Sequence, residues 1–324
     1  AIAAGNTAVL KPSAYSPATS EVVAKIIGKT FPPEYVSTVL GGREDNAALL
    51  EENFDYIFFT GSKNVGRLVM RKASEHLTPV TRELGGKSPC IVDETASLAV
   101  AAKRIAFGKY LNVGQTCVAP DYVWVDRRVH DEFLALLREE VARTYGDDAL
   151  ANPDYDHMVN RKHYDRVCGL VDAEKDGRVL MGGRRDDETL RIEPTVLDGV
   201  TESSPVMGEE IFGPVLPVLT YRTLDEAVAF VESRPRPLAL YLFTRSRENK
   251  KRVLARCRFG GGCINDTVVH LANERLPFGG VGESGMGAYH GRRGFEEFSH
   301  LRGVMDRALR PDLPVKYRPF GAPP

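Results

Sequence analysis

A chain of 324 residues is long enough to form two domains, each with its own hydrophobic core. Hydrophobic residues make up 43% of it and charged residues 27%, as is usual for a soluble globular protein. A formal net charge of −1 excludes the strongly basic surface that binds nucleic acid or an anionic membrane. The apolar runs are far shorter than a membrane span, so we expect no membrane partner.

Strand and helix patterns alternate over the first 84 residues. Apolar runs and apolar spacing predict strands at 7–11, 36–40 and 56–60 and helices at 18–30 and 64–74. This alternation is typical of the α/β class with a doubly wound parallel sheet, whose ligands bind at the carboxyl ends of the strands. Residues 1–6 read as the last turn of a helix closed by glycine. We therefore expect the chain to begin inside a fold, as an N-terminally truncated form.

The pattern continues with longer helices after Gly85-Gly86, where we place a domain boundary. The sequence predicts helices at 98–111, 131–145, 161–174, 224–233 and 247–257, and strands at 122–125, 178–181, 215–221 and 238–243. The predicted units are a partial dinucleotide-binding domain at 1–84, a second α/β catalytic domain at 85–285, and a C-terminal segment and tail at 286–324. The tail is rich in proline from residue 310, so we expect it to have little regular structure.

Five cysteines occur at irregular spacings and without a C-x-x-C pair: Cys90, Cys117, Cys168, Cys257 and Cys263. Their odd number and spacing argue against a disulfide framework or a metal site, and favour a reducing, cytoplasmic location. Most cysteines in proteins are buried and inert. Cys117 differs, because Gly114 allows close approach of the backbone and the following residues run into a strand. The other four keep the inert interpretation.

Glu83 ends a strand-like segment at 78–82 and precedes Gly85-Gly86. A carboxylate at a strand end can face a cleft, where burial raises its pKa and makes it a usable base. The alternative for this residue alone is a solvated loop charge.

Two glycine loops are candidates for binding phosphate. The loop with Gly61, Ser62 and Gly66 follows a strand and opens a helix, so its amides can hold a phosphate group. Residues 280–285 match the dinucleotide pattern G-x-G-x-x-G. We reject that match, because no strand precedes it and glycines interrupt any helix that would follow.

Two further positions carry charges that suit a nucleotide. Lys11 and Ser13 follow the first strand, where a cation can contact a ribose or a phosphate. Glu210 and Phe212 lie in a loop that pairs carboxylates with an aromatic ring, and Glu210 can accept from a sugar hydroxyl. Taken alone, each of these charges is better interpreted as a surface charge.

As a set, these segments resemble the aldehyde dehydrogenase superfamily over essentially the whole chain. Five matching motifs occur in the family's order: 5–13, 59–62, 83–89, 114–117 and 210–214. Residues 265–270 and 277–291 look most like the class 3 branch, which handles medium-chain aliphatic and aromatic aldehydes. No metal is implied, and the full-length form is expected to be a homodimer.

The resemblance implies the NAD(P)-dependent oxidation of an aldehyde to a carboxylic acid. Cys117 attacks the aldehyde to give a thiohemiacetal and then a thioester, and Glu83 activates the water that hydrolyses it. The same resemblance implies that NAD or NADP is bound by Lys11, Ser13, Gly61, Ser62, Gly66, the Leu84 carbonyl, Glu210 and Phe212.

The chain departs from the family pattern in two ways. Ala14 occupies a position where many relatives carry a glutamate that binds the adenosine ribose. Without that carboxylate a 2′-phosphate is not repelled, so we expect NADP to be accepted at least as well as NAD. The chain also lacks the asparagine that precedes this region in relatives and completes the oxyanion hole with the Cys117 amide. Losing one such donor costs about 2.7–4 kcal/mol, so we expect a chain starting at Ala1 to be nearly inactive. The opening β-α portion of the cofactor domain is also absent, so we expect this chain to expose apolar surface and to be poorly soluble.

Two other interpretations stay open at this stage. One is a thioester hydrolase or acyltransferase that uses Cys117 and Glu83 without hydride transfer, and a dinucleotide site argues against it. The other is a non-catalytic binding or scaffold protein. Measured cofactor binding would separate the first from a dehydrogenase, and the sequence before Ala1 would decide the second.

Overall fold

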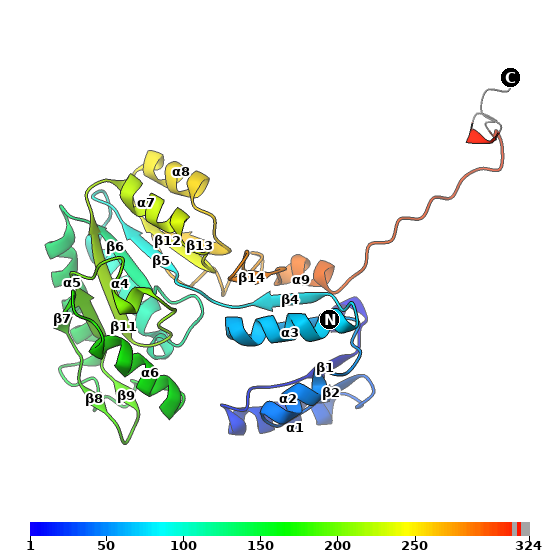
Figure 1. Ribbon diagram of the computed structural model, residues 1–324, viewed down its shortest axis with the longest axis horizontal. Helices are drawn as coiled ribbons and strands as arrows, with labels where there is room; N and C mark the ends of the chain where they lie inside the picture. Colours follow the sequence, from blue (N-terminus) through cyan, green and yellow to red (C-terminus); the bar gives the residue numbers. More distant parts are fainter. Residues whose placement is uncertain (313–315, 319–324) are drawn as a thin grey trace.

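The computed structural model describes residues 1–312 and 316–318, which form a larger and a smaller lobe (Figure 1). The larger lobe is built on one seven-stranded sheet, and the smaller lobe on a two-stranded and a three-stranded sheet. A hairpin forms a further two-stranded sheet at the edge of the larger lobe. No helix in the described part of the chain is long and apolar enough to cross a bilayer.

The smaller lobe has the predicted alternation of strands and helices. Its elements are β1 (Ala8–Leu10), α1 (Pro17–Thr30), β2 (Val36–Thr38), α2 (Arg43–Leu49), β3 (Ile57–Thr60), α3 (Lys63–Glu75) and β4 (Val80–Glu83), after a short 3-10 turn η1 (Ile2–Ala4). β1 pairs in parallel with β2, and β3 pairs in parallel with β4. The turn η1 ends at Gly5 in the left-handed conformation, as expected from the glycine. The polar helix α2 was not predicted, since its sequence has no apolar face.

Local sequence explains the two long helices of this lobe. α1 begins at Pro17, where the missing N–H of proline costs nothing because the first amides of a helix have no partner within it. α3 begins after Ser62, whose hydroxyl accepts from the Val65 amide at 3.5 Å. Its buried stripe faces the strands and consists of Gly66, Val69 and Ala73.

The seven-stranded sheet of the larger lobe has the order β13-β12-β5-β6-β11-β10-β7. Six strands are parallel: β5 (Pro89–Val92), β6 (Tyr122–Asp126), β10 (Thr195–Asp198), β11 (Val215–Tyr221), β12 (Ala239–Phe243) and β13 (Gly261–Ile264). The edge strand β7 (Arg178–Met181) is antiparallel to β10. All five residues of β6 and of β12 are buried, as expected for parallel strands covered on both faces. The α/β class with a largely parallel sheet is thereby confirmed.

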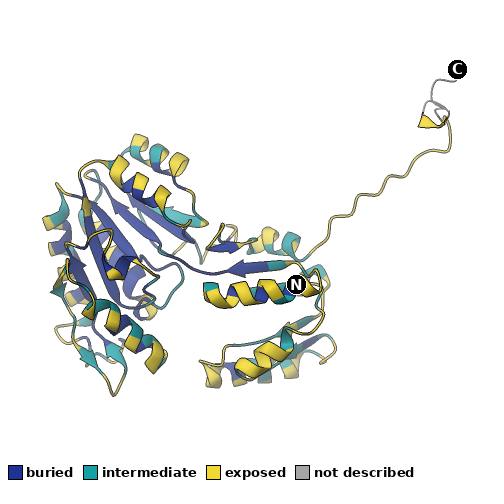
Figure 2. Ribbon diagram, viewed as in Figure 1, coloured by how far each residue is buried: buried dark blue, intermediate teal, exposed yellow. Residues whose placement is uncertain are grey.

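Two hydrophobic cores lie on the opposite faces of this sheet, which is dark in Figure 2 because it is buried. One face is covered by α4 (Leu98–Tyr110) and α5 (His130–Tyr145). The other is covered by α6 (Arg161–Asp172), α7 (Leu224–Ser233) and α8 (Arg247–Arg256). The remaining elements are η2 (Leu111–Gly114), the hairpin β8 (Arg185–Asp186) and β9 (Arg191–Ile192), η3 (Pro205–Met207), β14 (Gly285–Met286) and α9 (Gly291–Glu297).

Three strands of the large sheet were not predicted. β13 has the sequence Gly-Gly-Cys-Ile, which lacks the apolar run of a typical buried strand. A Cβ atom at Gly262 would lie 2.0 Å from the Leu240 carbonyl oxygen, so this close strand pairing requires glycine. β5 begins at Pro89, and β10 directly follows Pro194. Because proline is uncommon within strands, the sequence pattern did not predict either strand.

The rejected glycine motif at 280–285 has a structural role. It leads into β14, which pairs antiparallel to β4, with Gly285 opposite Glu83. The expectation that no helix would follow was wrong, since α9 begins at Gly291. In a dinucleotide loop the helix begins within the glycine motif, so that its first amides contact the pyrophosphate. Because α9 begins after the motif has ended, the motif is not a dinucleotide loop.

The predicted domain limits at 84/85 and 285/286 stay a prediction. Residues 285 and 286 join the sheet of the smaller lobe, close to the second predicted limit. After α9, residues 299–312 have no helix or strand and extend away from the body (Figure 1). The predicted irregular tail is therefore irregular at 310–312, and its residues 313–315 and 319–324 lie outside the described part of the chain.

Candidate active site

Cys117 and Glu83 come together from the two lobes. Glu83 is the last residue of β4, and Cys117 lies between η2 and β6. Glu83 is 2% exposed, and its Oε1 atom has no hydrogen-bond partner in the described residues. The Cys117 thiol lowers the pKa of this carboxyl group, against the effect of burial. The structure therefore places a thiol and a buried carboxyl next to each other.

Burial controls the acidity of this pair. It raises the pKa of Glu83, against the opposing effect of hydrogen bonds from Cys117 and from the Gly85 amide. Burial also raises the pKa of the Cys117 thiol, and the neighbouring charge of Glu83 raises it further. A carboxyl group with a raised pKa is a better proton acceptor, so Glu83 can act as a base toward a bound water or the thiol.

The turn before Cys117 is strained in a way that fixes the thiol. Asn112, Val113 and Gly114 all have positive φ, at 51°, 58° and 72°. A positive φ is energetically unfavourable for Asn112 and Val113, because both have a Cβ atom. Such backbone strain is found mainly at functional sites. A Cβ atom at Gly114 would lie 2.3 Å from the Gly213 carbonyl oxygen, so only glycine fits there.

Gln115 anchors the same turn. Its Oε1 atom accepts from the Val159 amide at 2.8 Å, and its Nε2 atom donates to the carbonyl oxygens of His157 at 3.1 Å and Asn112 at 3.2 Å. The side chain thus ties the turn to a distant loop. As a result, Cys117 is positioned by a rigid backbone.

A second carboxyl group, that of Glu210, lies beside Gly85 and accepts from the Gly86 amide. Burial raises the pKa of Glu210 to about 8, and the charges of Asp121 and Glu83 act in the same direction. Phe212, two residues further on, has a positive φ of 46°. The predicted residues Cys117, Glu83 and Glu210 therefore surround the link between the lobes.

The loop that carries Glu210 is held by three charged residues that sequence reasoning did not assign. Lys87 forms an ion pair with Asp121 and donates to the carbonyl oxygens of Val206 at 2.8 Å and Glu209 at 2.9 Å. Asp121, which is 3% exposed, accepts from the Ile211 amide at 2.9 Å.

Arg166 holds the same loop from α6. It donates to the carbonyl oxygens of Glu210 at 3.2 Å and Ile211 at 2.6 Å. Only Lys87 lay inside a recognised motif, and the other two could not be found without the fold, because their partners are 44 to 90 residues away.

The predicted cofactor residues near β4 are physically linked. The Gly61 amide donates to the Glu83 carbonyl oxygen at 3.1 Å, and Gly66 packs against the Leu84 side chain. Ser62 caps α3, so the first amides of this helix face outward, as a phosphate group requires. These residues are therefore linked to Glu83 through its backbone and through its neighbour Leu84.

Lys11 and Ser13 lie elsewhere, at the carboxyl end of β1. Lys11 Nζ donates to the carbonyl oxygens of Pro12 at 3.0 Å and Gly41 at 2.8 Å, and Ser13 Oγ accepts from the Tyr15 amide at 3.1 Å. Their sheet is not hydrogen-bonded to the sheet of β3 and β4 in the described residues. The structure therefore brings Gly61, Ser62, Gly66, Leu84 and Glu210 close to one another, whereas Lys11 and Ser13 belong to a separate sheet.

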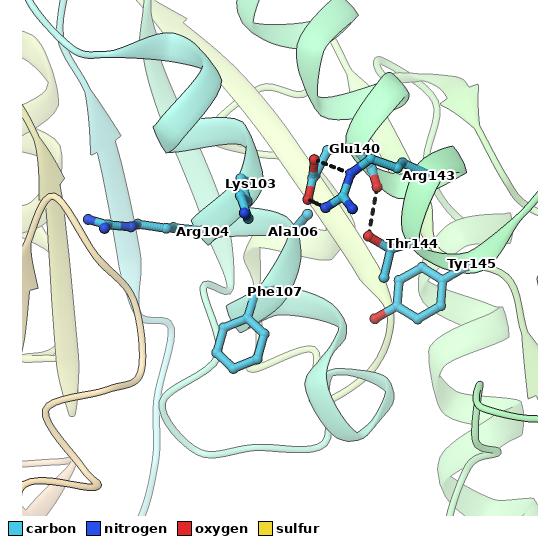
Figure 3. A pocket seen from close by; sticks show the side chains of 8 residues that line it. All are labelled: Lys103, Arg104, Ala106, Phe107, Glu140, Arg143, Thr144 and Tyr145. Carbon is cyan, nitrogen blue, oxygen red and sulfur yellow. Dashed lines mark hydrogen bonds and ion pairs between the residues drawn. The ribbon is translucent and has the colours of Figure 1, made fainter.

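A cavity of ≈ 290 Å³ lies between α4 and α5, away from these residues (Figure 3). It is lined by Lys103, Arg104, Ala106, Phe107, Glu140, Arg143, Thr144 and Tyr145. Arg143 Nε donates to Glu140 at 3.0 Å within it. None of the candidate site residues lines it. The described residues contain no group of three or more side chains suited to hold a metal ion.

The aldehyde dehydrogenase family model matches residues 1–304, and the chain belongs to this family. The 4,4'-diaponeurosporen-aldehyde dehydrogenase of Staphylococcus aureus is 49% identical over 99% of this chain and 70% of its own length. The dimeric NADP-preferring aldehyde dehydrogenase of Mus musculus is 46% identical over 98% of this chain and 70% of its own. Aldehyde dehydrogenase family 3 member B1 of Mus musculus is 47% identical over 99% of this chain and 69% of its own length.

Solved structures agree with this assignment. The substrate-bound state of Staphylococcus aureus AldH superposes with a TM-score of 0.93 at 49% identity, covering 98% of this chain and 69% of that one. An aldehyde dehydrogenase of Mycobacterium tuberculosis complexed with NAD+ superposes with a TM-score of 0.81 at 33% identity, covering 90% of this chain and 62% of that one. The predicted resemblance, including its class 3 character, is confirmed. So is the prediction of an enzyme that oxidises an aldehyde, and of NAD or NADP as its cofactor.

Proposed function

We propose that the protein oxidises medium-chain aliphatic or aromatic aldehydes to carboxylic acids, with Cys117 as nucleophile and Glu83 as base. The observation that carries this proposal is that the Cys117 thiol lies beside the buried carboxyl of Glu83, close enough for each to shift the pKa of the other. Glu83 Oε1 also has no partner in the described residues, which leaves it free to bind a water molecule. A hydrolytic step needs such an atom.

The reaction divides into two stages at Cys117. Glu83 accepts the thiol proton, and the thiolate bonds to the aldehyde carbon to form a thiohemiacetal. The aldehyde oxygen takes that proton from Glu83, which returns to its carboxylate form. NAD+ or NADP+ would supply the hydride acceptor, so that loss of hydride to it and of the hydroxyl proton to solvent leaves a thioester on Cys117. Glu83 then takes a proton from water, the hydroxide attacks the thioester carbon, and the carbon–sulfur bond breaks to release the acid. The thiolate is restored.

The surface around α3 and β4 suits the pyrophosphate and nicotinamide ends of the cofactor. The residues proposed to hold them are Gly61, Ser62, Gly66, the Leu84 carbonyl, Glu210 and Phe212. Support comes from the outward-facing amides of α3 and from the Glu210 carboxyl beside the link between the lobes. Burial raises the pKa of Glu210 to about 8, so its carboxyl group is mostly protonated below that pH. In that form it can both donate a hydrogen bond to a ribose hydroxyl and accept one.

Lys11 and Ser13 are proposed to hold the adenosine ribose. Ala14 is exposed and has no carboxylate that would repel a 2′-phosphate, while Lys11 offers a positive charge. We therefore propose that NADP is used at least as well as NAD. The mouse relative named as an NADP-preferring aldehyde dehydrogenase is consistent with this proposal.

The whole protein is proposed to act as a homodimer in the cytoplasm. A relative whose name includes "dimeric" supports the first part. All five cysteines are free, which suits a reducing compartment.

The test uses the protein in the form that the cell makes. The unmutated enzyme should form NAD(P)H from aliphatic and aromatic aldehydes, and Cys117→Ala should form none. Glu83→Gln should lower the rate of NAD(P)H formation by roughly 10²–10⁴-fold, because this variant lacks the base that both the thiol and the water need. Hydrolysis of a thioester without any cofactor, together with no aldehyde oxidation, would instead identify a hydrolase.

A further inference from the structure

A second cavity, of ≈ 140 Å³, lies behind the strand that carries Glu83. It is lined by Lys63, Arg67, Arg82, Leu84, Gly282 and Glu283. Arg82 and Leu84 line it, whereas Glu83 between them does not, because successive side chains of a strand point to opposite faces. The cavity is therefore separate from the thiol and carboxyl pair.

Arg82 is the unusual feature of this cavity. It is only 8% exposed, and its Nε atom is buried without a hydrogen-bond partner. No ion pair of Arg82 occurs within residues 1–312 and 316–318. A buried charge without a partner is costly, and a guanidinium group cannot lose its proton to avoid the cost.

Lys109 provides an instructive contrast. Its Nζ atom is also buried without a hydrogen-bond partner in the described residues. Burial lowers the pKa of Lys109 to about 8, so this amine can become neutral near physiological pH. Arg82 differs in carrying its charge on a guanidinium fork, whose buried Nε atom faces no partner among the described residues.

The charges around the cavity are unbalanced. Lys63 Nζ forms an ion pair with Glu283 Oε2 at 3.0 Å, which leaves Arg67 and Arg82 without a carboxylate. Arg236 adds a further cation next to this loop, since its Nη1 atom lies 3.9 Å from the position of a Cβ atom at Gly282. Glu283 is the one acidic residue among the described residues that line the cavity.

We propose that this cavity binds a phosphate-type oxyanion, held by the guanidinium groups of Arg82 and Arg67 and by Lys63. An arginine fork matches the oxygen geometry of such an anion in two parallel hydrogen bonds. A volume of ≈ 140 Å³ equals about four to five water molecules at ~30 Å³ each, which suits one tetrahedral anion.

The primary test is thermal unfolding with inorganic phosphate against chloride at equal ionic strength. At about 100 times its Kd, phosphate should raise the Tm of the unmutated protein by about 3–5 °C. Arg82→Met should abolish this rise. Arg71→Met is the matched control, because Arg71 lies one turn further along α3 and does not line the cavity, and it should keep the full rise. An equal phosphate response in Arg82→Met and the unmutated protein would overturn the proposal, as would no response in either.

Calorimetric titration with inorganic phosphate keeps the test decisive if Arg82→Met does not fold. Arg67→Met should then weaken phosphate binding at least tenfold, and unchanged binding contradicts the site. A phosphomonoester in place of inorganic phosphate shows whether the anion can be part of a larger molecule. A final arm adds saturating NADP+. Phosphate stabilisation that persists supports a separate site, whereas its complete loss means that the cofactor itself occupies the cavity and that the proposal is wrong.

Discussion

The carboxyl group of Glu210 lies directly against the backbone of Gly85, where a Cβ atom would come within 2.5 Å of Glu210 Oε1. Gly85 also has a φ of +67°, in the left-handed region that favours glycine. The proposed ribose-binding carboxyl group and the link between the lobes therefore fit only if no side chain is present at position 85.

Gly85→Ala should displace Glu210 and lower kcat/KM for the cofactor by roughly 10²-fold, the usual cost of a misplacement of about 1 Å. Gly5→Ala is a matched control, because Gly5 has a φ of +82° but no atom within 4 Å of its Cβ position. That variant carries similar backbone strain and should keep normal steady-state kinetics. Equal losses in the two variants would mean that strain, and not contact with Glu210, is responsible.

Glu210 should also make stability depend on pH. Its folded-state pKa is raised from 4.5 to about 8, so the native protein binds more protons than the unfolded chain between these values. This contribution is complete below pH 4.5 and is lost as the pH rises toward 8. In the unmutated protein the free energy of unfolding should fall by roughly 1.4 kcal/mol per pH unit across this window, and in Glu210→Gln this decrease should be absent. Urea unfolding of both proteins across the window measures the difference, and parallel curves would contradict the assignment.

Lys87→Met should destabilise the protein by about 3–5 kcal/mol, because it leaves the buried carboxylate of Asp121 unpaired. The double variant Lys87→Met with Asp121→Asn should lose less than the sum of the single losses. Lys72→Met serves as a surface control. Its ion pairs with Glu51 at 2.7 Å and Glu75 at 3.3 Å are exposed, so the loss should stay below about 1 kcal/mol. Chemical unfolding gives all four values, and strict additivity would show that the pair is not coupled.

Ala14→Glu tests the cofactor proposal. A carboxylate at this exposed position should lower kcat/KM for NADP about tenfold or more through repulsion of the 2′-phosphate. The value for NAD should change little or rise. Steady-state kinetics with both cofactors provide the comparison, and a strong NAD preference already present in the unmutated protein would reject the proposal.

The sequence predicted those parts of the fold whose pattern is local. The helix α3 and the strand β12 follow from apolar spacing within a dozen residues, and Cys117 and Glu83 from the motifs around them. β13 was missed because its glycines serve close packing against β12, which is visible only in three dimensions. The contacts of Lys87 with the Glu210 loop were not predicted for the same reason, since the partners of Lys87 lie 34 to 122 residues away in the sequence.

The thiol and its base belong to different lobes, and the chain crosses between them at Gly85 and Gly86, with φ values of 67° and 141°. Any event that tilts one lobe against the other must lengthen or shorten the Cys117–Glu83 contact. In the mechanism proposed above, proton transfer between the two groups therefore depends on how the lobes are oriented. A ligand or substitution far from the sulfur would change that transfer by reorienting a lobe, without contacting either group.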